Sequence, residues 1–167
     1  GVLDGKLFTS DNQGNYVPVN KFIHIPTNPD PGFERYFGFP NNHAFQARGE
    51  TPPTLWLPHG EVAMSPAEPM AFPASSQFAG QMMLATLAHG GVKRIFLEEV
   101  EGELQGAVFR FSQGLEVGPM RIVADENDHL YIGGQGKRAV IPWGWKYTEE
   151  GLEKLVPTGA VPFEMLA

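Results

Sequence analysis

Glycine and proline are spread through the whole chain and limit how long any regular element can be. The 167 residues include 20 glycines and 15 prolines, about one residue in five, against a usual combined share of roughly 12%. Charged residues make up only 19% of the chain, whereas hydrophobic residues reach 42%. Frequent turn formers with few charges favour short strands over a helix bundle. The length suits one domain with a hydrophobic core, so we predict a single all-β domain over residues 1–167.

The charge balance and the cysteine count exclude several functional classes. Asp and Glu number 19 against 12 Lys and Arg, which gives a net charge of −7 and argues against a nucleic-acid binder that follows phosphates. Without cysteine there is no disulfide framework, no cysteine-ligated metal site, no haem attachment motif and no cysteine nucleophile. No apolar run approaches the ~18 residues that a membrane-spanning helix needs. We therefore predict neither a nucleic-acid partner nor a membrane span.

Short apolar or alternating runs between turn residues predict the strands. Residues 7–10 and 16–25 flank a turn-forming cluster at residues 11–15, and we expect a hairpin. The alternating apolar residues of the second run share one face, with Lys21 as the exception: Val17, Val19, Ile23 and Ile25. Further strands are predicted at residues 54–57, 61–64, 81–87, 92–98, 106–111, 120–124 and 129–132.

The remaining segments are predicted as connections, with one helix-like window. Residues 26–53 are rich in proline and asparagine but carry five aromatic residues, too many for a solvated tether, so we expect an ordered loop packed on the domain. Residues 67–78 form a second proline-rich connection. Thr148 is a candidate N-cap for a helix over residues 148–155. Just before it lie three aromatic residues that either stack on sugars or pack the domain: Trp143, Trp145 and Tyr147.

The strongest local candidate for chemistry is the sequence His59-Gly60-Glu61. It follows Trp56 and Pro58, and a turn there would place an imidazole beside a carboxylate, as in a general base and the group that orients it. The simpler interpretation is a hydrogen-bonded turn. The five histidines show no HxH, HxxH or HxxxH spacing, so no local metal site is indicated.

Two acidic runs are predicted to be hairpin turns rather than ion sites. The run from Asp125 to Asp128 begins like a calcium loop, but Leu130 stands where such a loop needs glycine. The acidic residues of the other run most simply form a solvated hairpin tip: Glu98, Glu99, Glu101 and Glu103.

Several stretches taken together resemble a known family over nearly the whole chain. In order they are SDNQGNYVP (10–18), LWLPHGEV (55–62), HGGVKRIFLE (89–98), QGAVFRFSQGLE (105–116) and PFEMLA (162–167). The set resembles the propeller part of glucose/sorbosone dehydrogenase-like (quinoprotein-type) proteins, as found in large secreted proteins of planctomycete-type bacteria.

This resemblance implies a six-bladed β-propeller whose blades are four-stranded antiparallel sheets. Six blades need far more than 167 residues, so the chain would be a partial propeller with long proline-rich loops. Residues 1–25 would form a blade hairpin, residues 26–53 an ordered loop and residues 54–167 the later blades. The chain begins at Gly1 rather than Met, and we expect it to be processed or to belong to something longer. The remaining blades, or a second copy of the chain, would complete the ring.

The resemblance also implies a location and a cofactor site. Such proteins are secreted or periplasmic, and quinone-dependent members bind pyrroloquinoline quinone (PQQ) above calcium. Backbone carbonyls matching Gln13 and Gly14 would hold the calcium. Trp56 would lie near the quinone ring, with the turn at His59 beside it, and Arg121 would be the nearby cation. Gly118 and Met120 stand where the family has the basic residues that bind the quinone carboxylates.

Three functions remain open from the sequence. The first is part of a PQQ-dependent dehydrogenase that takes a hydride from a sugar or another alcohol and passes electrons to a cytochrome c. The second is a non-catalytic propeller that has lost the cofactor and binds a small sugar, a polysaccharide or a protein. The third is a hydrolase that uses His59 and Glu61.

Overall fold

The computed structural model describes residues 1–13, 19–27, 51–135 and 151–158, and these form three antiparallel β-sheets. The all-β prediction is confirmed. The first sheet runs in the order β1 (Val2–Leu3), β2 (Lys6–Asp11), β3 (Val19–Ile25) and β4 (Leu55–Pro58). The second contains β5 (Pro66–Ala71), β6 (Met82–Thr86), β7 (Gly91–Val100) and β8 (Glu103–Arg110), with a 3₁₀ turn η1 (Leu87–His89) after β6. The third contains β9 (Gly118–Ala124), β10 (Leu130–Gln135) and β11 (Gly151–Leu155).

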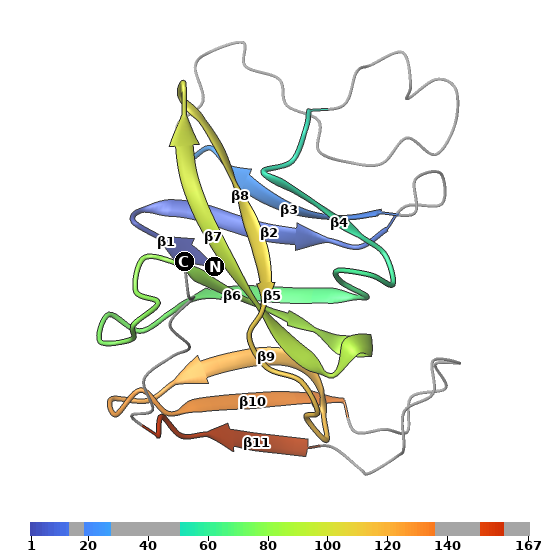
Figure 1. Cartoon of the computed structure of the whole chain (residues 1–167), viewed down its shortest axis with the longest axis vertical. Helices are drawn as coiled ribbons and strands as arrows, with labels where there is room; N and C mark the ends of the chain where they lie inside the picture. Colours follow the sequence, from blue (N-terminus) through green and yellow to red (C-terminus); the bar gives the residue numbers. More distant parts are fainter. Residues whose placement is uncertain (14–18, 28–50, 136–150, 159–167) are drawn as a thin grey trace, which may run out of the picture.

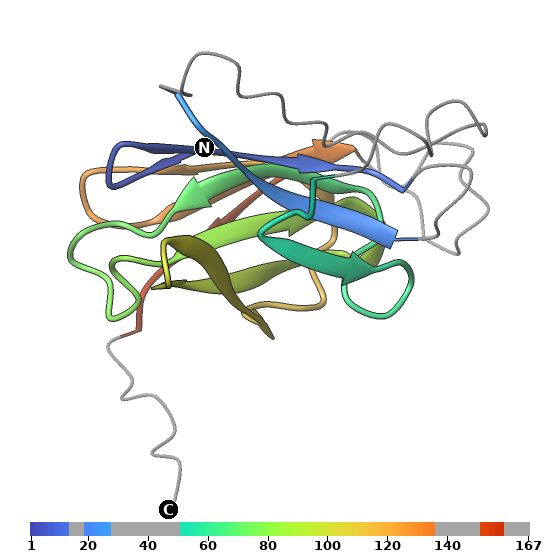
Figure 2. The same cartoon turned by 90° about the horizontal axis from the view of Figure 1, so that it is seen from above.

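The three sheets stack in chain order, with the second sheet in the middle (Figure 1). Figure 2 shows the same stack from above, with the sheets lying over one another. β5, the first strand of the second sheet, packs beside both β2 and β9. The Ser10 hydroxyl on β2 donates a hydrogen bond to the carbonyl of Ala67 on β5 at 2.7 Å. The first two sheets are thus four-stranded with their strands in chain order, the third has three described strands, and strands of all three sheets lie close to β5.

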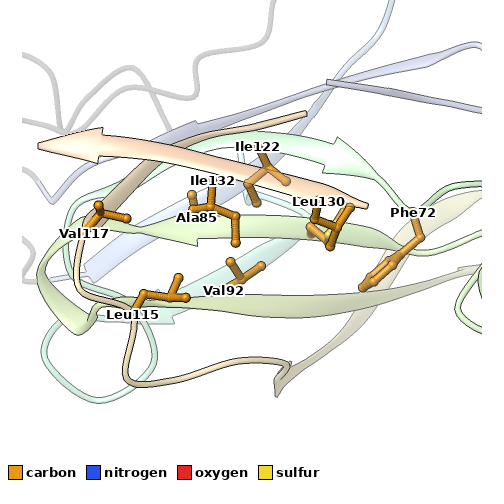
Figure 3. Packing of buried hydrophobic residues seen from close by; sticks show 9 residues of the cluster. Phe72, Ala85, Val92, Leu115, Val117, Ile122, Leu130 and Ile132 are labelled. Atoms are coloured by element: carbon orange, nitrogen blue, oxygen red, sulfur yellow. The ribbon is translucent and has the colours of Figure 1, made fainter. Parts of the chain in front are cut away.

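Strand β6, an inner strand of the second sheet, is buried on both faces, which explains its run of five apolar or small residues. Met82 and Leu84 face the first sheet, where they pack in a cluster with Phe8, Phe22 and Ile95. Met83 and Ala85 face the third sheet. Figure 3 shows that second cluster, in which Val92, Ile122 and Ile132 close the space between the sheets. Two apolar layers thus hold the stack together.

Both predicted hairpins of the second half are confirmed. β7 and β8 pair over eight residues, and the hairpin turns at Glu101-Gly102, both with positive φ, the geometry of a two-residue turn. The acidic residues lie in the exposed end of this hairpin, as predicted. β9 and β10 pair around the turn at residues 125–128.

Three predicted elements are wrong, each for a reason outside the local sequence. Residues 61–64 form a turn, closed by the bridge between His59 and Ala63, instead of a strand. Residues 67–71 of the predicted connection 67–78 belong to strand β5, because β5 lies at a sheet edge with an irregular register near its prolines, where a missing N–H is tolerated. Gly151–Leu155 is a strand rather than a helix, because pairing with β10 outweighs a weak helix preference.

The face of β3 that packs on the second sheet is not the face picked out by its alternating apolar residues. Phe22 enters the core between the sheets and stacks on Phe8 at 5.3 Å. Ile23 and Lys21 are buried on the opposite face. Val17, most of the predicted loop at residues 26–53, and Trp143, Trp145 and Tyr147 lie outside the described residues.

Candidate functional site

The turn after β4 carries His59 and Glu61 and is a hydrogen-bonded turn, as the simpler interpretation proposed. The N–H groups of Val62 and Ala63 both donate to the carbonyl of Pro58, at 3.0 and 3.3 Å. Gly60 has a φ of 79°, a conformation that favours glycine. Glu61 is exposed, and His59 Nδ1 is buried without a hydrogen-bond partner among the described residues. The predicted contact between imidazole and carboxylate is therefore not formed in this turn.

A fully buried asparagine fixes the position of that turn. Asn20 on β3 donates from Nδ2 to the carbonyls of Leu57 at 3.2 Å and Ala63 at 2.9 Å. Its Oδ1 accepts the N–H of Gln13 at 2.9 Å. One side chain thereby ties the end of β2, the strand β4 and the turn to each other. The sequence analysis did not single out Asn20, because its partners lie up to 43 residues away.

Beside this turn lies a small polar cavity of about 210 Å³ between the first and second sheets. Its wall on the turn side is formed by Gly60 and Glu61. The lining also includes two cations, Lys93 on β7 and Arg110 on β8. The remaining lining residues are Thr86, Gly91, Ser112 and Gln113.

The strand register places the two cations next to each other. Lys93 and Arg110 are direct partners in the β7–β8 ladder, so their side chains project from the same face of the sheet. That face is the one that carries Ile95 toward the first sheet. Burial lowers the pKa of Lys93, and the positive charge of Arg110 lowers it further. Like charges directly opposite each other are unfavourable, so this pair favours an anion in the cavity.

Hydrogen bonds orient the neutral groups around these cations. Arg110 donates to the side-chain oxygen of Gln113 at 2.7 Å. Ser112 Oγ accepts the N–H of Val92 at 3.2 Å, which leaves its own proton available. Among the residues that the structure describes, neither Lys93 nor Arg110 forms an ion pair with a carboxylate. The cavity therefore presents several donors that are not all matched by acceptors of the chain.

Trp56 lies on a different surface from this cavity. It is 44% exposed on β4, and Lys21 Nζ lies 5.1 Å from the centre of its ring, at the register partner position on β3. Burial lowers the pKa of Lys21, and the nearby charge of Asp11 opposes this shift. Because neighbours along a strand point to opposite faces, Trp56 projects away from the face on which Leu57 packs against the second sheet.

Arg121 lines another cavity, of about 550 Å³, where β2, β5 and β9 meet. Its guanidinium is paired with the carboxylate of Glu68 on β5. Gly118 is buried, and a Cβ there would lie 2.7 Å from Leu87 Cδ1, so a side chain at this position would require Leu87 to move. Met120 is 41% exposed and brings no charge. Neither of the two positions that the resemblance assigns to quinone carboxylates carries a cation, and Arg121 is the charged residue next to them.

The residues predicted for a cofactor are therefore dispersed. Trp56 and His59 line neither of these cavities, and Glu61 and Arg121 line different ones. A quinone with several carboxylates needs cations and an aromatic surface in one pocket, and neither of these two cavities brings Trp56, His59 and Arg121 together. Gly14 lies outside the described residues, and the N–H of Gln13 is bound to Asn20. No group of three or more potential metal-ligating side chains occurs within the described ranges.

The acidic turn at residues 125–128 uses its first carboxylate internally. Asp125 Oδ1 accepts the N–H groups of Asn127 and His129, and Oδ2 contacts His129 Nδ1 at 2.9 Å and the Tyr131 hydroxyl at 3.2 Å. Partial burial would raise the pKa of Asp125, but these hydrogen bonds and the charge of His129 lower it to about 2. This is a closed hairpin turn, as predicted.

A third, larger cavity of about 580 Å³ has a mixed lining in which three phenylalanines form an apolar part. Phe72, Phe78 and Phe111 line it and pack edge to face or at a tilt, with ring centres 5.1 to 6.0 Å apart. Asp128 is the charged residue among its described lining residues. An acidic ligand therefore finds its binding groups in the small polar cavity instead.

Comparison with known proteins adds no relative. A scan against protein-family models finds no match, and neither does a search of curated proteins or of solved structures. The described residues also contain no helix that is long and apolar enough to cross a membrane.

Proposed function

We propose that this chain forms three consecutive blades of a β-propeller of the glucose/sorbosone dehydrogenase-like group, and that it binds a carbohydrate without oxidising it. The observation that carries the proposal is the stacking of three antiparallel sheets in chain order around β5. Sequential sheets of this kind are the repeating unit of a propeller. The secreted or periplasmic location of that group is part of the proposal.

A binding role is favoured over quinone chemistry by the surroundings of Arg121. Gly118 and Met120 supply no charge where the resembled family has basic residues. Arg121 is already paired with Glu68, although an exposed ion pair of this kind is worth only about 0–1 kcal/mol. The alternative is a dehydrogenase part that keeps PQQ and calcium and passes electrons to a cytochrome c.

A titration with PQQ and calcium distinguishes these two functions. We expect no change in the quinone absorbance spectrum when the chain is added, and no reduction of a redox dye by aldoses in the mixture. Addition of calcium without quinone serves as the blank. A bound-quinone spectrum accompanied by dye reduction would establish the dehydrogenase alternative. It would contradict the proposal that the chain has lost the cofactor.

The outer face of the third sheet carries exposed apolar side chains beside the cations Arg121 and Lys154, and we expect a further sheet to cover it. Val123 is 61% exposed and Leu152 is 70% exposed, and both project away from the second sheet. Between them lies Tyr131, with Lys154 Nζ 5.2 Å from its ring centre. Exposed apolar clusters of this kind mark interaction surfaces. Since the other two sheet interfaces have the same face-to-face form, we propose another antiparallel sheet as the partner.

In the isolated chain, a second copy is expected to provide that sheet. Sedimentation should then show a species larger than the 18.3 kDa monomer, and Leu152→Lys should shift it toward the monomer by placing a charge in the interface. Val100→Lys, at the distant tip of the β7–β8 hairpin, is the matched control and should leave the mass unchanged. A wild-type chain that stays monomeric at high concentration would contradict this use of the face.

A further inference from the structure

We propose that the polar cavity between the β4–β5 turn and the β7–β8 hairpin binds the carboxylate of a sugar acid. The choice of a sugar rests on the carbohydrate-binding function proposed above. The choice of an acidic group rests on the cavity itself. The cavity is lined by two adjacent cations, Lys93 and Arg110, and by Glu61 from the β4–β5 turn.

The net charge of the lining residues favours a ligand with one negative charge. Lys93 and Arg110 together carry two positive charges, and Glu61 carries one negative charge, so the empty cavity has a net charge of about +1. A carboxylate neutralises it. A doubly charged phosphate would instead leave an excess negative charge facing Glu61, and like charges at close range repel.

The geometry suits a carboxylate placed between the two strands. Lys93 and Arg110 project from opposed positions of the ladder, so one oxygen can accept from each. The planar guanidinium of Arg110 already uses one nitrogen for Gln113 and keeps its remaining donors. The free proton of Ser112 Oγ adds a further donor at the edge of the cavity.

Two other lining residues, Glu61 and Gln113, suit the hydroxyl groups of a sugar. Glu61 is exposed and acts only as an acceptor when ionised, so it matches hydroxyl groups that donate. The amide nitrogen of Gln113 provides a complementary donor. The volume of about 210 Å³ is below the ~300 Å³ of pockets for drug-sized ligands. That size admits one sugar ring with its acid group and excludes the body of a long, bulky ligand.

The test is a calorimetric titration of the chain with glucuronate, glucose and inorganic sulfate. We expect glucuronate to bind, glucose to show no heat, and sulfate to bind less tightly than glucuronate. Lys93→Met, which keeps the length and removes the charge, should weaken glucuronate about 10- to 100-fold, the usual effect of losing one charge-assisted hydrogen bond. Lys6→Met removes a charge from a surface pair with Glu99 and is the matched control.

A second variant distinguishes a loss of binding from a loss of folding. Arg110→Gln changes an exposed side chain, so it should keep the circular dichroism spectrum and lose affinity to a similar degree. In the wild type, glucuronate should also shift the NMR resonance of the Lys93 side-chain nitrogen, which a purely structural lysine would not show.

Other outcomes overturn the inference and separate it from the proposed function. Glucose binding as tightly as glucuronate, with no effect of Lys93→Met, would remove the acidic ligand but keep a carbohydrate-binding role. If sulfate bound more tightly than glucuronate, a sugar acid would be ruled out as the preferred ligand. Absence of binding by all three ligands would remove this cavity as a site, while the quinone titration would still decide the proposed function.

Discussion

Asn20→Ala is expected to lower the free energy of unfolding by about 3 kcal/mol or more. The substitution removes three hydrogen bonds at once, each with a net value of roughly 1 kcal/mol, and leaves buried backbone groups without a partner. Urea unfolding followed by circular dichroism measures the change. The size of the effect reflects the position of Asn20, which is fully buried where the first sheet meets the turn of residues 59–63.

The same substitution should also weaken the polar cavity. The carbonyl of Ala63 loses its bond to Asn20, so the wall formed by Gly60 and Glu61 is no longer fixed relative to Lys93. Asn127→Ala changes an exposed asparagine in a hairpin turn and is the matched control, with an expected change within about 0.5 kcal/mol. If Asn20→Ala cost less than about 1 kcal/mol, the turn would be held by other contacts and this account would fail.

Leu84→Ala is expected to cost about 2–5 kcal/mol, the usual range for removing a fully buried leucine side chain. Leu84 lies on β6, against which both neighbouring sheets pack. Because β6 is held from both faces, it cannot shift to close the cavity that the substitution leaves. Because one strand contributes to both apolar layers, we expect the whole stack to unfold in one transition. Circular dichroism and tryptophan fluorescence should therefore give coincident curves.

Two further variants check this interpretation. Met83→Ala removes a side chain on the other face of β6 and should cost about 2–5 kcal/mol in the same single transition. Val123→Ala trims a side chain that is 61% exposed and should change stability by less than about 0.5 kcal/mol in the monomer. Two separated transitions in Leu84→Ala would mean that the sheets fold independently.

Local features of the fold were predictable because they depend on residues close in the sequence. The hairpins β7–β8 and β9–β10 were predicted, since each pairs neighbouring alternating runs around a turn. The proline-containing strand β5 and the strand β11 were missed, because edge position and pairing with β10 are properties of the sheet. The face of β3 that meets the second sheet could not be derived from its alternation, since only the stacking decides which face meets another sheet.

The candidate site was predictable in one part only. Glu61 was selected from the sequence and does line the polar cavity. Lys93 and Arg110 were not selected, although each interrupts an apolar stretch, and that interruption was the available signal. The two cations are 17 positions apart and become neighbours only through the ladder register.

The sequence by itself determined an all-β chain of short strands, because glycine, proline and a two-residue alternation act within a few residues. It also determined the absence of cysteine chemistry and the acidic balance. Only the tertiary structure decided which strand faces are buried and which strand lies in the middle of the stack. It alone placed Asn20 against the turn and brought Glu61 into one cavity with two cations, since these arrangements depend on contacts between residues far apart in the chain.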